Sequence, residues 1–165
     1  MLEKKGISEK EWVYQAISDK FIQNKGDVMH KVQAGAVTFN RPDFYFITDV
    51  NFDRGKEECR VILSDLAKRK KFIGYKELAD KLTITYPYDE DPKFTVIAHM
   101  VGELSHECHA SGLPLISALV VNKTDGSDHQ GLPGNGFFEL AGWLGEDVSD
   151  QMVFWSVQVN RIFNP

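Results

Sequence analysis

The chain has 165 residues, of which 42% are hydrophobic and 26% are charged, and its formal net charge at pH 7 is −5. These proportions are those of an ordinary globular protein, and they argue against a disordered or fibrous chain. A chain of this length buries roughly 70% of the surface that its unfolded form exposes, so it needs no disulfide or metal for stability. We therefore expect a single folded domain over residues 1–165.

Several features of the sequence predict the cellular location of the protein. The N-terminus lacks the apolar run of a secretory signal, and no segment approaches the ~18 to 20 apolar residues that a membrane span requires. Cys59 and Cys108 each fall on the apolar stripe of a predicted helix, so we interpret both as reduced core residues. We expect a cytoplasmic protein with no membrane partner.

Charge is distributed unevenly along the chain. Residues 1–93 hold 17 of the 19 Lys and Arg residues against 16 acids, whereas residues 94–165 hold 2 against 8 acids. The first part therefore carries about +1 and the second about −6 by direct count of the sequence. Because binding to duplex DNA needs several cations on one face, this asymmetry argues against a phosphate contact in the second part.

The first elements in chain order are a helix and a hairpin. Ser8 and Glu11 form a capping box that predicts a helix over residues 9–24. Two β-rich runs, at residues 36–39 and 44–48, flank a turn that contains proline, a pattern typical of a hairpin. Residues 49–53 alternate oxygen ligands as a calcium loop does but lack its glycine and final acid, so we interpret them as a strand end leading to a helix cap at Asp53.

Three amphipathic helices follow. Apolar residues at helical spacing predict helices over residues 54–70, 75–82 and 93–111, with a loop over residues 83–91. On a helical wheel, the third helix places one face in the core and an opposite face toward solvent. The predicted buried face comprises Val96, Ile97, Met100, Val101, Leu104 and Cys108, and the predicted exposed face comprises His99, Gly102, Glu103, His106 and His109.

The remaining chain predicts a β-hairpin and two helices. Residues 115–121 form a continuous apolar run typical of a buried strand, residues 124–130 form an exposed tip, and residues 131–138 return from it. A short helix is predicted over residues 137–143, and Ser149 is placed to cap a last helix. The expected fold class is thus α+β.

The order of three helices, strand, tip and strand over about residues 54–138 is that of a winged helix, with further helices at both ends. This stretch resembles the DNA-binding domain of alkylguanine-DNA alkyltransferases and of their catalytically inactive alkyltransferase-like relatives. The motifs that carry the resemblance lie within residues 55–126 and are Gly74-Tyr75-Lys-Glu-Leu-Ala79, Val101-Gly102, Val120-Val121-Asn122 and Asp125-Gly126.

The chain departs from that family at the reacting centre. Where the family has Pro-Cys-His-Arg, this chain has Leu115-Ile-Ser-Ala118, so the cysteine that accepts the alkyl group is missing and methyl transfer is excluded. The helix over residues 93–111 also lacks the arginine that replaces an extruded base in the family. The resemblance therefore implies an architecture, with DNA binding as an analogy and no catalytic residue.

Two groups of residues are candidates for binding. The first is a basic cluster with a neighbouring aromatic residue, placed to contact phosphates: Lys68, Arg69, Lys70, Lys71 and Tyr75. The alternative is that the cations are a solvated helix end and the tyrosine packs at the edge of the core. The second group is a possible polar site beside the glycine-rich residues 131–136 and on the helix before them: Asn122, Lys123, Asn135, His99, Glu103 and His106.

A metal site is not the favoured interpretation of the histidines. His99, Glu103 and His106 share one helical face, and His129 could complete the set, but zinc needs three or four converging ligands. Cys108 points to a different side of the helix. We therefore predict neither a metal nor a cofactor, and a glycine-rich turn in place of a nucleotide loop at residues 131–136.

Three functions remain open. The leading hypothesis is a small, non-catalytic nucleic-acid-binding protein, with regulation as one role, that places the helix over residues 93–111 in the groove. The second is an acidic protein-interaction module or inhibitor of a nucleic-acid enzyme, whose partner has a basic surface. Residues 120–123 and 133–138 look like segments of short bacterial or prophage proteins. The third is a small metal-dependent hydrolase or nuclease.

Overall fold

The computed structural model describes residues 48–84, 90–123 and 131–165, and within residues 90–95 it describes the backbone alone. The helix predicted over residues 9–24, the hairpin predicted before Thr48 and the tip predicted over residues 124–130 lie outside the described residues.

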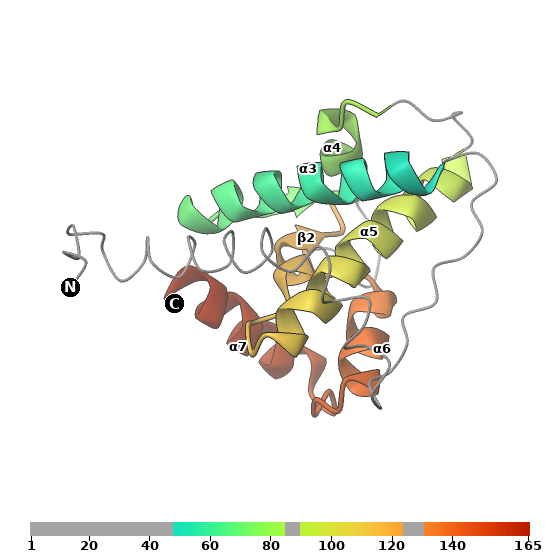
Figure 1. Ribbon diagram of the computed structural model, residues 1–165. Helices are drawn as coiled ribbons and strands as arrows, with labels where there is room; N and C mark the ends of the chain where they lie inside the picture. The colour runs from blue at the N-terminus through green and yellow to red at the C-terminus, as the bar shows by residue number, and fades with distance from the viewer. Residues whose placement is uncertain (1–47, 85–89, 124–130) are drawn as a thin grey trace, which may run out of the picture. The chain divides into compact units, whose positions relative to one another are not determined.

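The chain divides into two compact units, Phe39–Phe163 and a second unit of Met1–Thr38 with Asn164–Pro165. All helices and strands described below belong to the first unit (Figure 1). The expectation of a single domain over the whole chain stays a prediction.

Helix α3 (Asp49–Lys68) begins five residues before its predicted start. The hydroxyl of Thr48 accepts a hydrogen bond from the backbone N–H of Asn51 at 3.2 Å, so threonine is the N-cap. The expectation that residues 49–53 end a strand and that Asp53 caps the helix is therefore wrong. Both Thr and Asp are good caps, and the earlier one begins the helix.

Two further helices confirm their predictions closely. Strand β1 (Ile73–Gly74) leads directly into α4 (Tyr75–Lys81), and α5 (Glu90–Ala110) begins three residues before Lys93. This early start brings Pro92 into the first turn of α5. A proline is tolerated there because the first amides of a helix have no partner within it.

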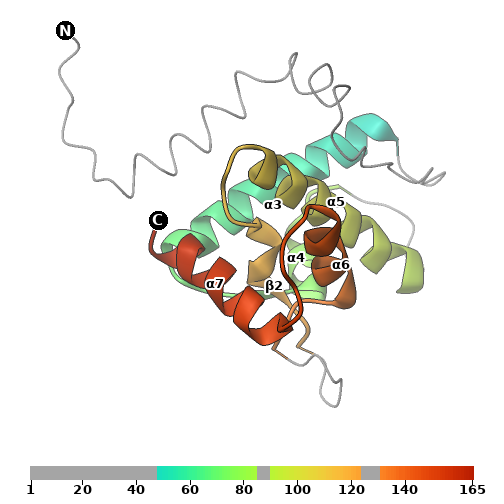
Figure 2. The same ribbon diagram turned by 90° about the horizontal axis from the view of Figure 1, so that it is seen from below.

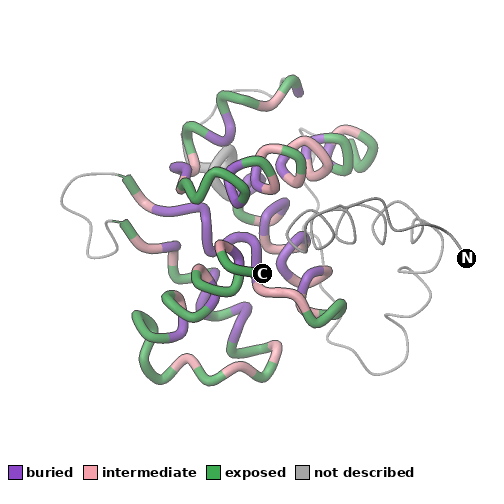
Figure 3. Tube along the Cα trace, turned by 90° about the vertical axis from the view of Figure 1, so that its left-hand side faces the viewer, coloured by how far each residue is buried: buried purple, intermediate pink, exposed green. Residues whose placement is uncertain are grey.

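Helix α5 is the centre of the unit. It packs against α3, α4, the 3-10 helix η1 (Ile116–Leu119) and α6 (Asn135–Trp143), as the two views in Figures 1 and 2 show. Every residue of its predicted apolar face is buried, and Figure 3 shows the buried positions gathered toward the interior of the unit. That face comprises Val96, Ile97, Met100, Val101, Leu104 and Cys108.

The segment predicted as a strand over residues 115–121 is mostly a 3-10 turn. Only β2 (Val120–Val121) is extended, and it pairs in parallel with β1, with Ile73 opposite Val120 and Gly74 opposite Val121. Residues 115–119 are fully buried and bond to α5 and the last helix instead of to a strand. The return segment is anchored at Asn122, whose N–H donates to the carbonyl of Leu132 at 2.8 Å.

The C-terminal helices are as predicted apart from their ends. Helix α6 begins two residues early at Asn135, and α7 (Gln151–Phe163) is capped by Asp150, not by Ser149. The carboxylate of Asp150 accepts a hydrogen bond from the N–H of Val153 at 3.0 Å. A carboxylate also interacts favourably with the positive end of the helix dipole, which explains why it takes the cap.

The described residues confirm an α+β class, because helices surround a small parallel sheet. The two thiols are free and buried, as predicted, and burial raises the pKa of both Cys59 and Cys108 to about 12. No helix within residues 48–84, 90–123 and 131–165 is both long enough and apolar enough to cross a membrane.

Candidate functional site

The predicted basic cluster, residues 68–71, forms the turn that ends α3, and we call it the basic turn. Its four side chains belong to exposed residues. The N–H of Lys70 donates to the carbonyl of Ala67 at 3.1 Å, and the N–H of Lys71 donates to that of Leu66 at 3.0 Å. This pair of bonds is a Schellman motif, so the turn is fixed by its backbone.

The cations of the basic turn differ in their surroundings. Arg69 forms an ion pair with Asp65 one turn earlier in α3, in which both side chains are more than half exposed. Lys70 has φ of +53°, which is the left-handed region that favours glycine. The basic turn therefore presents positive charge on a backbone that is locally strained.

Tyr75 is less exposed than the residues of the basic turn. Its hydroxyl accepts a hydrogen bond from the N–H of Gly134 at 3.3 Å, and burial raises the pKa of the phenol above 10. The tyrosine thus ties the start of α4 to the start of α6. This contact suits a residue at the core edge, and a phosphate contact by Tyr75 stays a prediction.

The structure brings part of the predicted polar site to Tyr75. A Cβ atom added at Gly134 would lie 3.5 Å from the tyrosine oxygen and 4.0 Å from the amide nitrogen of Asn122. Lys123 forms an ion pair with Glu77 at 2.9 Å, and Asn135 is the first residue of α6. Asn122 and Asn135 therefore lie near the start of α6, whereas Lys123 lies at the start of α4.

Glu77 is the member of this group that the sequence analysis missed. Its carboxylate accepts the backbone N–H of Gly74 at 3.2 Å and the ammonium of Lys123 at 2.9 Å. The hydrogen bond from Lys123 is the main cause that lowers the pKa of Glu77 below 4.5. The spacing of three residues from Gly74 to Glu77 at a helix start is the signal that could have indicated it.

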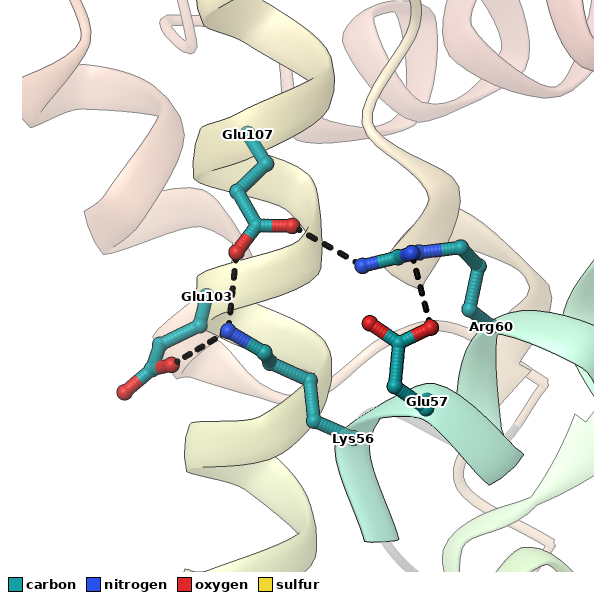
Figure 4. Close-up of polar contacts among 5 residues, drawn as sticks. All are labelled: Lys56, Glu57, Arg60, Glu103 and Glu107. Atoms are coloured by element: carbon teal, nitrogen blue, oxygen red, sulfur yellow. Dashed lines mark hydrogen bonds and ion pairs between the residues drawn. The ribbon is translucent and has the colours of Figure 1, made fainter. Parts of the chain in front are cut away.

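Glu103, another residue of the predicted polar site, contacts α3 instead. Glu103 accepts a hydrogen bond from Lys56 at 3.1 Å, and Glu107 accepts bonds from Lys56 at 2.8 Å and from Arg60 at 3.3 Å (Figure 4). The side chains of Lys56, Arg60 and Glu103 are only 12–13% exposed, and that of Glu107 is 18% exposed. We call these four residues the α3–α5 charge network.

This network corrects the expectation that the histidine side of α5 faces solvent. Within residues 96–110, only Ala98 and Ala110 are exposed, while His99, Glu103 and His106 are of intermediate burial. The physical reason is that α3 packs against the edge of that side, where Lys56 and Arg60 form ion pairs with the two glutamates of α5.

The histidines do not assemble a metal centre in the described part of the chain. No group of three or more His, Cys, Asp or Glu residues is placed there to hold a metal ion, and His129 lies outside it. Burial lowers the pKa of His99 below 6.5, against the smaller opposing effect of Glu103. His109 lies 3.3 Å from the carboxylate of Glu146 in the loop before α7.

Comparison of the chain with models of protein families, with curated proteins and with solved structures finds no match.

Proposed function

We propose that this protein binds the phosphate backbone of nucleic acid through its basic turn, residues 68–71, on a frame of winged-helix type. The proposal takes α3, α4 and α5 as the helices of this frame, and it takes β2 and the hydrogen bonds between Asn122 and residues 131–132 as the base of a wing, although β1 and η1 also lie in this stretch. Phosphate contact requires several exposed cations close together, and the basic turn supplies four in succession, of which Arg69 is also paired with Asp65.

The observation that carries the proposal is the conformation of Lys70. Helices α5 and α6 end in the same Schellman motif, and there the left-handed position is occupied by Gly112 and Gly145. In α3 that position holds a lysine. The left-handed conformation costs a residue with a Cβ about 1 kcal/mol or more. A cation is thus held at an energetic cost where glycine would be favourable, a pattern expected when the side chain has a function.

The proposed contact does not read sequence. Phosphate contacts position a protein on nucleic acid, whereas base contacts specify the site. The polar side of α5, which the leading hypothesis placed in the groove, is taken up by the α3–α5 charge network. We therefore propose binding of low sequence specificity, in which α5 supports the frame and the basic turn makes the contact.

Fluorescence anisotropy with labelled duplex and single-stranded oligonucleotides tests the proposal. If about four phosphates are contacted, the logarithm of affinity falls with the logarithm of salt concentration at a slope near −3.6. The variant Lys70→Asn/Lys71→Gln keeps a residue that tolerates the left-handed conformation and removes two cations. Its expected slope is about −1.8, with weaker binding for every sequence tested.

Arg54→Gln is the matched control, because Arg54 is an exposed cation on the same helix. It lies 14 residues before Lys68, which is about 21 Å along the helix axis. This variant should keep the affinity and slope of the wild type. Undetectable binding, or equal losses in both variants, would contradict a contact at the basic turn.

A further inference from the structure

A hollow of about 240 Å³ lies along one side of α7. Val153 and Val157 line it and are 58% and 50% exposed, and they share a face because they are four residues apart. Phe154, which is 7% exposed, also lines it. We call this hollow with its lining residues the α7 groove.

The α7 groove has an acidic end and a single cation. Glu146, Asp147 and Asp150 line it just before α7 begins, and Arg161 lines it in the last turn of that helix. The carboxylates of Asp147 and Asp150 accept hydrogen bonds from backbone amides, which hold them in place without neutralising them. Hydrogen bonds from Ser149 lower the pKa of Asp147 below 3.8, so it is charged at neutral pH.

The acidic residues of the α7 groove differ from those on α5 in their ion pairs. Glu103 and Glu107 are matched by Lys56 and Arg60 of α3, so the fold itself balances them. At the acidic end of the α7 groove, the ion pair of Glu146 is with His109, which is charged only when protonated. An apolar strip beside an excess of carboxylate charge is complementary to a chain that carries both apolar and basic residues.

We infer that the α7 groove binds a cationic amphipathic helix of another protein. Such helices lay their apolar face into a hydrophobic groove while their charges meet the rim. The stretch from Asp150 to Arg161 spans about 16 Å, which matches about three turns of a partner helix. A second copy of this chain is not the occupant that the charges favour, because each α7 groove is lined by three carboxylates and one arginine, so two copies would bring together an excess of like charge.

The test uses a fluorescein-labelled peptide of leucine and lysine with amphipathic spacing over about four helical turns. Fluorescence anisotropy measures its binding to the full chain. Val153→Ser/Val157→Ser should weaken binding at least about tenfold, and Asp147→Asn/Asp150→Asn should weaken it by a similar factor. Asparagine preserves both hydrogen bonds to backbone amides, so the second variant removes charge alone.

Matched controls decide whether the binding is specific. Val50→Ser/Val61→Ser removes two valines of α3 that are 78% and 69% exposed, and it should bind the peptide as the wild type does. A scrambled peptide of the same composition and a leucine–glutamate peptide should both bind at least about tenfold more weakly.

Equal binding of the scrambled peptide would overturn the inference, because charge alone would then explain the attraction. Unchanged binding by the valine variant of α7 would also overturn it. Self-association of the wild type in light scattering, lost in the valine variant of α7, would replace the partner helix by a second copy. None of these results bears on the basic turn, whose test uses nucleic acid and different variants.

Discussion

Two hydrogen bonds join Ser105 to Ser117 in the core. The hydroxyl of Ser105 donates to the hydroxyl of Ser117 at 2.6 Å, and its oxygen accepts the backbone N–H of Ser117 at 3.0 Å. Both residues are buried, at 0% and 4% exposure. The pair joins the middle of α5 to η1, and it satisfies the polar backbone of a segment that does not lie in a sheet.

We expect Ser105→Ala to destabilise the protein by about 1 to 3 kcal/mol, because it leaves the buried N–H of Ser117 without an acceptor. Ser117→Ala should cost less, about 1 kcal/mol, since its backbone N–H keeps the oxygen of Ser105. Urea denaturation of both variants measures the difference in free energy of unfolding. An equal or reversed order would contradict the role given to the Ser105 oxygen.

Lys56→Met should destabilise the protein by about 3 kcal/mol, because it leaves two largely buried carboxylates without their shared cation. The matched control is Arg69→Met, whose partner Asp65 is more than half exposed, and its expected cost is below about 1 kcal/mol. Thermal and urea denaturation measure both. Similar costs in the two variants would show that the α3–α5 charge network is solvated.

The same network predicts a loss of stability in alkali. Burial lowers the pKa of Lys56, but Glu107 and Glu103 outweigh this effect, and the net pKa is raised above 10.5. The favourable contribution is therefore complete below pH 10.5 and is lost as the pH rises through the folded-state pKa. Urea denaturation at increasing pH should show a steeper decline for the wild type than for Lys56→Met, and parallel curves would contradict this.

Gly55→Ala should destabilise the protein by up to about 1 kcal/mol, although alanine is the better helix former, because the ends of two buried side chains must shift. The added Cβ would clash with Ile84 and lie 2.7 Å from the end of the Met100 side chain. Gly136 in the first turn of α6 has no atom within 4 Å of an added Cβ. Gly136→Ala should therefore stabilise the protein by up to about 1 kcal/mol in the same denaturation assay.

The lowered pKa of His99 predicts that the protein loses stability in acid. Its pKa is below 6.5 in the folded protein, so the unfolded chain binds the proton more readily. The favourable contribution is complete above pH 6.5 and is lost as the pH falls through the folded-state pKa. The wild type should lose more stability than His99→Gln between pH 7 and pH 5, as urea midpoints would measure. Equal losses would show that His99 titrates as in the unfolded chain.

Local patterns made the core of α5 predictable, whereas contacts between distant segments were not. The buried face of α5 follows from spacing within a single helix. The pairing of Lys56 with Glu103 spans 47 residues, and no pattern in one sequence joins positions so far apart. For this reason the polar side of α5 was expected in solvent.

The candidate sites were predictable only where a local pattern in the sequence reveals them. Four consecutive cations are visible in the sequence, but the left-handed conformation of Lys70 depends on the backbone of the turn. The run over residues 115–121 fitted a buried strand because apolar runs do not distinguish strands from other buried segments. The α7 groove needed the structure, since the same spacing of valines would also suit a fully buried helix.

Amide NMR spectra of the full chain during titration with a short DNA duplex at low salt test the proposed contact most directly. We predict that the largest shift changes fall on the amides of residues 68–71 and that these changes disappear at high salt. An absence of changes at residues 68–71, or changes concentrated on α5 or α7, would contradict the proposal.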